Sequence, residues 1–184
     1  NTAYEGKRNT TKAHWETMKE HGWSEMFKVD IMDENEDIKI PVRGGKILDK
    51  NYVGKNLENY DSLLVLSHFK GHPMGGYGGA LKNISIGIAS SKGKAYIHGG
   101  GTFEDMFKAD HDSFLISMAD SAKSIMDYEK DNIAFINVMC NMSVDCDCCA
   151  VAEDPKIKDI GILSSLDPVA LDQACVDLVY NSED

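Results

Sequence analysis

Residues 63–66 read LLVL, and they lead directly into the polar, glycine-rich stretch SHFKGHPMGGYGGALKN at residues 67–83. A short, continuous apolar run of this kind is typical of a β-strand that is buried on both faces, as in a parallel sheet. In open α/β sheets, ligands bind at the loops that follow the carboxyl ends of the strands. The pattern therefore predicts a buried strand with a ligand site directly after it.

The rest of the chain alternates between further strand and helix patterns. Strands are expected at residues 38–42, 133–138 and 160–163. Helices are expected at residues 9–22 and 112–128, and a last helix begins with Asp167 as N-cap and Pro168 in its first turn. The alternation predicts an α/β layered fold, with a mostly parallel sheet flanked by helices, in a single domain over residues 1–184.

Composition limits the classes of function. The chain has 184 residues, 42% of them hydrophobic and 27% charged, as in ordinary globular proteins. Its net charge of -11 argues against a nucleic-acid partner, because a phosphate backbone would be repelled. No apolar run is long enough to cross a membrane, so no membrane partner is expected. The five cysteines are an odd, clustered set without a signal peptide, which indicates the reducing cytoplasm.

The densest chemical signal is the run DCDCC at residues 145–149. Thiolates at this density are typical of metal or redox chemistry, and a C-x-C pair can give one ion two sulfur ligands from a single turn. Cys146, Cys148 and Cys149 are therefore predicted metal ligands. The alternative is that these cysteines pack as small apolar residues, which is the interpretation preferred for Cys175.

Histidines follow the buried strand at a spacing that also suits a metal. His68 and His72 are four residues apart, and His98 could complete a set of three. Imidazole and thiolate together suit zinc or iron. Alternatively, His98 is a loop residue with no such role.

Lysines and glycines in the same stretch suggest an anion site. Lys70 and Lys82 could hold a small anionic ligand, assisted by backbone amides of the glycine-rich loop; its predicted site glycines are Gly76, Gly78 and Gly79. The spacing fits neither a Walker loop nor a dinucleotide fingerprint. The alternative is that the glycines serve tight turns and close packing. Asp172, in the last helix, is interpreted as part of a solvated face or a salt bridge.

Three segments, taken in order, resemble the family called domain of unknown function 362, whose members are often labelled iron-sulfur centre proteins. They are LSHFKGHPMGGYGGALKNISIGIASSKGK at residues 66–94, CDCC at residues 146–149 and DIGILSSLDPVALDQACVDLV at residues 159–179. The resemblance covers nearly the whole chain and implies an α/β fold without implying a reaction.

Two features of similar proteins are missing from this chain. Many carry an inserted ferredoxin-like segment with C-x-x-C-x-x-C spacing, where this chain has GGGTFEDMFKADHD at residues 99–112. A C-x-C pair is poorly spaced for a cubane cluster, so a mononuclear zinc or iron site is the simpler expectation. Similar proteins also have an additional amino-terminal α/β portion, so we expect the chain to be an amino-terminally truncated fragment.

Three functions follow as hypotheses. The leading one is a metal-binding or iron-sulfur-associated protein, with its Cys/His site at the carboxyl edge of the sheet. The second is a small-molecule enzyme that binds an anionic substrate at the Lys/Gly-rich loop, where a histidine moves a proton. The third is a thiol redox sensor or scaffold, in which neighbouring cysteines oxidise reversibly.

Overall fold

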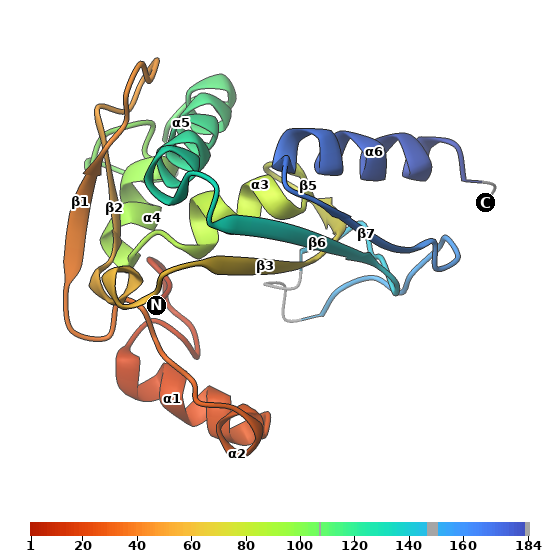
Figure 1. The fold of residues 1–184 in the computed structure, drawn as a ribbon, viewed down its shortest axis with the longest axis horizontal. Coiled ribbons are helices and arrows are strands. Elements are labelled where there is room, and N and C mark those ends of the chain that lie inside the picture. The colour runs from red at the N-terminus through yellow and green to blue at the C-terminus, as the bar shows by residue number, and fades with distance from the viewer. Residues whose placement is uncertain (107, 147–150, 183–184) are drawn as a thin grey trace. The chain divides into compact units, whose positions relative to one another are not determined.

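The structure, a computed structural model, describes residues 1–106, 108–146 and 151–182. The chain divides into two compact units, where the sequence predicted one domain (Figure 1). The first unit comprises residues 1–61 and 88–124, and the second comprises residues 62–87 and 125–184. None of the described helices is both long enough and apolar enough to span a membrane.

The first unit combines a two-stranded antiparallel sheet with helices. Its elements are α1 (Thr11–Glu20), α2 (Trp23–Met26), β1 (Asp37–Pro41), β2 (Lys50–Gly54), a 3₁₀ helix (Lys55–Asn59), α4 (Ser91–His98) and the first part of α5 (His111–Glu129). Helix α1 begins where the sequence predicted, because the Thr10 side chain accepts a hydrogen bond from the Ala13 amide.

Buried polar side chains on α5 hold the segment around β2 in place. The Asp120 carboxylate, 7% exposed, accepts hydrogen bonds from the backbone amides of the turn at residues 46–48 at distances of 2.8 to 3.1 Å. Asn51, fully buried, donates to the hydroxyls of Ser121 and Ser124. These contacts make the inner face of α5 partly polar, which an apolar periodicity does not reveal.

The second unit contains a three-stranded sheet, a short hairpin and helices. Its elements are β3 (Leu63–His68), β4 (Lys70–His72), β5 (Gly76–Gly78), α3 (Ala80–Lys82), a π-helical turn (Asn83–Gly87), the end of α5, β6 (Ile133–Met139), β7 (Gly161–Ser165) and α6 (Pro168–Tyr180). The sheet order is β3-β6-β7, and α6 packs against β6 and β7 (Figure 1). The Asp167 cap is confirmed, since its side chain accepts from the amides of Val169 and Ala170.

The expectation of a mostly parallel sheet was wrong. Strands β3 and β6 are parallel, with Leu63 opposite Ile133, but β6 and β7 are antiparallel, with Val138 opposite Ile162. A parallel neighbour needs a crossover connection, usually a helix. The described residues between β6 and β7 form no helix, and the chain re-enters the sheet from the edge at which it left. The sheet is therefore mixed.

The expectation that β3 is buried on both faces was also wrong. Leu64 is 61% exposed and Leu66 is 64% exposed, whereas Ser67 is buried. On the neighbouring strand β6, burial alternates, with Ile133, Phe135, Asn137 and Met139 inside. A continuous apolar run does not distinguish one buried face from two, because both satisfy the same pattern. The face that bears Phe135 and Asn137 is the one covered by α6.

Candidate functional site

The glycine-rich stretch after β3 forms a two-stranded hairpin rather than an extended loop. Strands β4 and β5 pair with Lys70 opposite Gly78 and His72 opposite Gly76. Gly76 has a φ of +75°, a left-handed conformation that favours glycine at a turn. The hairpin thus lies directly after the carboxyl end of β3, as the sequence predicted.

The hairpin brings together both of the lysines predicted to hold an anion. A Cβ placed on Gly78 would lie 3.7 Å from Cε of Lys70 and 3.7 Å from Cδ of Lys82. Both lysine side chains are half-buried, so their stems flank Gly78 on one face of the hairpin. The stems of two lysines thereby converge on one small surface of an acidic chain.

The backbone amides that follow the glycines are used by the protein itself. Oδ1 of Asp172 accepts from the amide of Ala80 at 2.8 Å, and Oδ2 accepts from the amide of Leu81 at 2.9 Å. Consecutive amides after a glycine-rich loop can hold an anion, and here a carboxylate from α6 lies in that position. These two amides are consequently not available as donors to a ligand in this conformation.

Asp172 is buried rather than solvated, which corrects the interpretation drawn from the sequence. It is 1% exposed, and Nδ2 of Asn137 on β6 donates to its Oδ1 at 2.7 Å. Burial raises the pKa of its carboxyl, although the hydrogen bonds from Asn137, Leu81 and Ala80 act in the opposite direction. The side chain therefore joins α6, β6 and the start of α3.

Gly79 has a packing role beside Asp172. A Cβ on Gly79 would lie 2.5 Å from Oδ1 of Asp172, closer than real Cβ atoms approach an oxygen. This is the close-packing alternative that the sequence left open for the glycines, and it applies to Gly79. Gly76 serves the turn, whereas Gly78 lies between the lysines.

His68 lies where the sequence predicted, at the carboxyl edge of the sheet. The parallel pairing of β3 and β6 brings it beside Cys140, and its Nε2 is 2.8 Å from the Cys140 carbonyl oxygen. Because a carbonyl only accepts, this contact requires a proton on Nε2 and leaves Nδ1 as the acceptor nitrogen of a neutral ring. A neutral His68 ring in this tautomer suits a metal ligand through Nδ1.

His72 has hydrogen bonds that do not suit a metal ligand. It is 9% exposed, and its Nδ1 accepts from the backbone amides of Met74 and Gly75 at 3.2 and 2.9 Å. A neutral ring that accepts at Nδ1 carries its proton on Nε2, so neither nitrogen then offers a lone pair to an ion. In this arrangement His72 stabilises the turn of the hairpin.

The other predicted ligands are not gathered into one set by the described residues. His98 belongs to the first unit, where its Nδ1 donates to the Lys94 carbonyl and its ring stacks on Phe114. Cys146 is buried in the second unit, while Cys148 and Cys149 lie outside the described residues. No group of three or more His, Cys, Asp or Glu residues within the described ranges could hold a metal ion. The described residues alone thus do not complete the predicted site.

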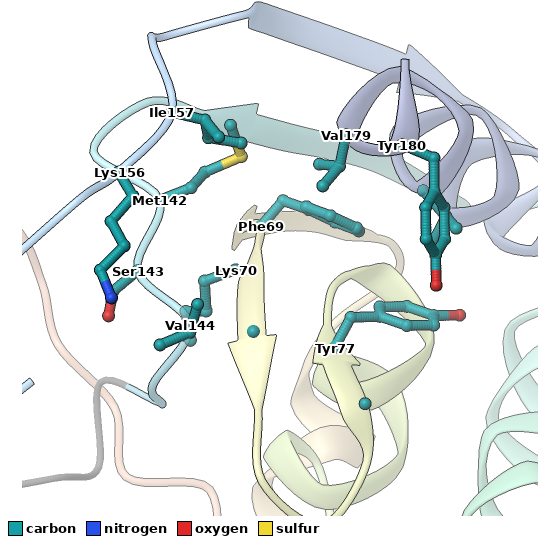
Figure 2. A pocket seen from close by; sticks show the side chains of 13 residues that line it. Phe69, Lys70, Tyr77, Met142, Ser143, Val144, Lys156, Ile157, Val179 and Tyr180 are labelled. Atoms are coloured by element: carbon teal, nitrogen blue, oxygen red, sulfur yellow. The ribbon is translucent and has the colours of Figure 1, made fainter. Parts of the chain in front are cut away.

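A pocket of about 330 Å³ lies beside the hairpin in the second unit, and the sequence did not predict it (Figure 2). Phe69 and Tyr77 form one wall, their rings stacked with centroids 5.5 Å apart. Met142 and Ile157 line it on one side and Val179 on the other. Phe69 and Tyr77, the two aromatic residues of the glycine-rich stretch, were the sequence signal for this pocket. Apolar periodicity does not show that they pack near residues of α6.

Comparison with known proteins gives the chain a family. The model of the family described as "Domain of unknown function (DUF362)" matches residues 2–177. The chain belongs to this family. No curated protein and no solved structure gave a significant match to it. The resemblance drawn from residues 66–94, 146–149 and 159–179 is thereby confirmed, and the DUF362 assignment itself brings no reaction, metal or ligand.

Proposed function

We propose that this DUF362 protein binds a small anionic molecule on the face of the β4–β5 hairpin that carries Lys70 and Lys82. The observation that supports the proposal is the convergence of the two lysine stems, each 3.7 Å from the position of a Cβ on Gly78. Two lysines whose stems converge on one surface attract a small anion more strongly than a single lysine does. The net negative charge of the chain repels anions from most of its surface, so a local pair of lysines is where an anion can bind.

The side chains, rather than the loop amides, are the donors in this proposal. Asp172 already accepts from the amides of Ala80 and Leu81, so a bound phosphate or carboxylate is held by ammonium groups at the hairpin surface. His72 lies two residues from Lys70 on the same strand, and side chains two apart share a face. A histidine therefore lies on the same face of the strand as Lys70, which is the placement that the enzyme hypothesis requires.

Removing either lysine is expected to weaken anion binding. Titration of ¹⁵N-labelled protein with inorganic phosphate should shift the Gly78 amide signal, and Lys70→Ala or Lys82→Ala should lower the affinity by about tenfold, as for loss of one charge-assisted hydrogen bond. Lys158→Ala is the matched control, because Lys158 is exposed and distant in sequence from the hairpin. Equal affinities in the lysine variants and the control would refute the proposal.

Metal binding, the leading hypothesis from the sequence, stays a prediction. His68 lies at the carboxyl edge of the sheet, where its Nε2 donates to the backbone carbonyl of Cys140, and Cys146 belongs to the same unit. The iron-sulfur association, the cytoplasmic location and the thiol-redox alternative also stay predictions; the last depends on Cys148 paired with Cys149 or with Cys146.

Metal analysis of anaerobically purified protein tests this second candidate. If zinc or iron is bound through thiolates, Cys146→Ser should lower the metal content, and elemental analysis by mass spectrometry measures it directly. His72→Ala should leave the content unchanged, because Nδ1 of His72 accepts from two backbone amides and a neutral ring then carries its proton on Nε2. An unchanged metal content in Cys146→Ser, or a fall in His72→Ala, would contradict this ligand assignment.

A further inference from the structure

The pocket lies on the opposite face of the hairpin from the lysine pair. Side chains alternate along a strand, so Tyr77, opposite Gly71, points away from the face shared by Lys70 and Gly78. The stacked rings of Phe69 and Tyr77 form the pocket wall on that second face. Lys70 also borders the pocket, whereas Lys82 does not line it. The two faces thus offer two different environments for ligands.

The interior of the pocket is apolar. Phe69 and Met142 are 3% and 5% exposed, and Ile157, Val176 and Val179 complete the lining. A volume of about 330 Å³ is within the range of natural small-molecule sites. It corresponds to roughly ten non-hydrogen atoms if each takes about the volume of a water molecule. The body of a ligand that fills it is therefore a short hydrocarbon chain or a single substituted ring.

Polar groups stand at the two ends of the pocket. Lys156 and Ser143 line one end, and Figure 2 shows the Tyr77 and Tyr180 hydroxyls on the far side of Phe69 from them. Lys156 pairs with Glu153 at 2.6 Å, but both side chains are mostly exposed, and such pairs contribute little to stability. Burial and the nearby Asp172 charge raise the pKa of Tyr77 to about 12, so its phenol stays protonated at neutral pH. One end therefore suits an anion, and the other suits a neutral hydrogen-bonding group.

We infer that this pocket binds a medium-length organic carboxylate, whose hydrocarbon body lies between Phe69 and Val179 and whose acid group meets Lys156. The pocket shares Lys70 with the anion site proposed above, but Lys156 and Val179 belong to the pocket and Lys82 does not, so variants of these residues test the two sites independently. A carboxylate at Lys156 takes the place of Glu153 as the partner of the ammonium group. Neutral hydrocarbons lack that interaction, and short acids lack the apolar body, so neither class matches the whole pocket.

A series of carboxylates tests the inference by isothermal titration calorimetry. From acetate to octanoate, below micelle concentrations, affinity is expected to rise about threefold for each added methylene until the pocket is filled. Lys156→Ala should weaken octanoate about tenfold and leave octan-1-ol unchanged. Because Lys156 is exposed, this variant is expected to fold normally. No gain in affinity with chain length would overturn the inference.

Variants on α6 locate the binding site. Val179→Trp should fill the pocket and abolish octanoate binding, whereas Val169→Trp, on the same helix but 61% exposed and not part of the lining, should have no effect. Lys82→Ala should leave octanoate affinity unchanged even where it removes phosphate binding, so the failure of one site does not imply failure of the other. Equal octanoate affinities in the two tryptophan variants would place the ligand elsewhere and refute the inference.

Discussion

Asp172→Asn is expected to lower the free energy of unfolding by about 2 to 4 kcal/mol. The wild-type carboxylate accepts hydrogen bonds from Ala80, Leu81 and Asn137 at 2.7 to 2.9 Å, and it is 1% exposed. An asparagine has one acceptor oxygen, so its amide group must face at least one of these donors. A buried donor without a partner carries its full desolvation penalty. Urea denaturation followed by circular dichroism measures the change.

A matched variant on the same helix separates this effect from a general loss of charge. Asp177 is exposed, and among the described residues its side chain accepts only from Gln173, so Asp177→Asn should change stability by less than about 0.5 kcal/mol. Amide hydrogen exchange gives a second readout, because the protection of Ala80 and Leu81 should fall in Asp172→Asn alone. Similar effects from both variants would mean that the buried hydrogen bonds contribute little.

The pH dependence of the Asp172 effect has a definite sign. Burial raises the pKa of this carboxyl in the folded state, so folding favours its protonated form relative to the unfolded chain. Its contribution to stability is then fully present below the unfolded pKa, about 3.9, and decreases as pH rises through the folded value. The stability difference between the wild type and Asp172→Asn should therefore be larger near pH about 4 than near pH about 8.

Local patterns predicted the elements of this fold better than their arrangement. The strand at residues 133–138 and the cap at Asp167 depend on neighbouring residues alone, and both were confirmed. The direction of β7 depends on how the chain returns from residue 139 to residue 161, which composition does not encode. The exposure of Leu64 and Leu66 depends likewise on which surfaces the rest of the fold covers.

In the candidate site too, local sequence patterns were better predicted than contacts between distant segments. Lys70 and Lys82 were predicted together because they flank a glycine-rich stretch after a strand, and the hairpin brings their stems beside Gly78. Asp172 was misinterpreted because an acidic residue in a helix is usually solvated, and its three donors come from segments 35 to 92 residues away. The four-residue spacing of His68 and His72 suggested a shared metal site, but His72 lies on a strand and its Nδ1 accepts hydrogen bonds from amides of its own hairpin.

Gly71→Ala is expected to disturb the hairpin and the pocket together. A Cβ at residue 71 would lie 2.1 Å from the carbonyl oxygen of Val144 and 2.5 Å from its carbonyl carbon. Because these atoms are backbone, no change of rotamer relieves the overlap, and residues 143–144 must move away. That movement breaks the 2.8 Å hydrogen bond from the Gly71 amide to the Ser143 carbonyl. The combined cost is about 2 kcal/mol or more in the free energy of unfolding.

Gly78→Ala is the matched control for Gly71→Ala, because both residues belong to the same hairpin. Within the part of the chain that the structure describes, a Cβ on Gly78 meets only the flexible stems of Lys70 and Lys82 at 3.7 Å, an ordinary van der Waals distance. Its effect on stability should stay within about 0.5 kcal/mol. Ser143 and Val144 line the pocket, so Gly71→Ala should also reduce octanoate affinity, measured by calorimetry. If Gly71→Ala is as stable as Gly78→Ala, the 143–144 segment is not held against the hairpin, and the pocket lacks the wall from which its ligand was inferred.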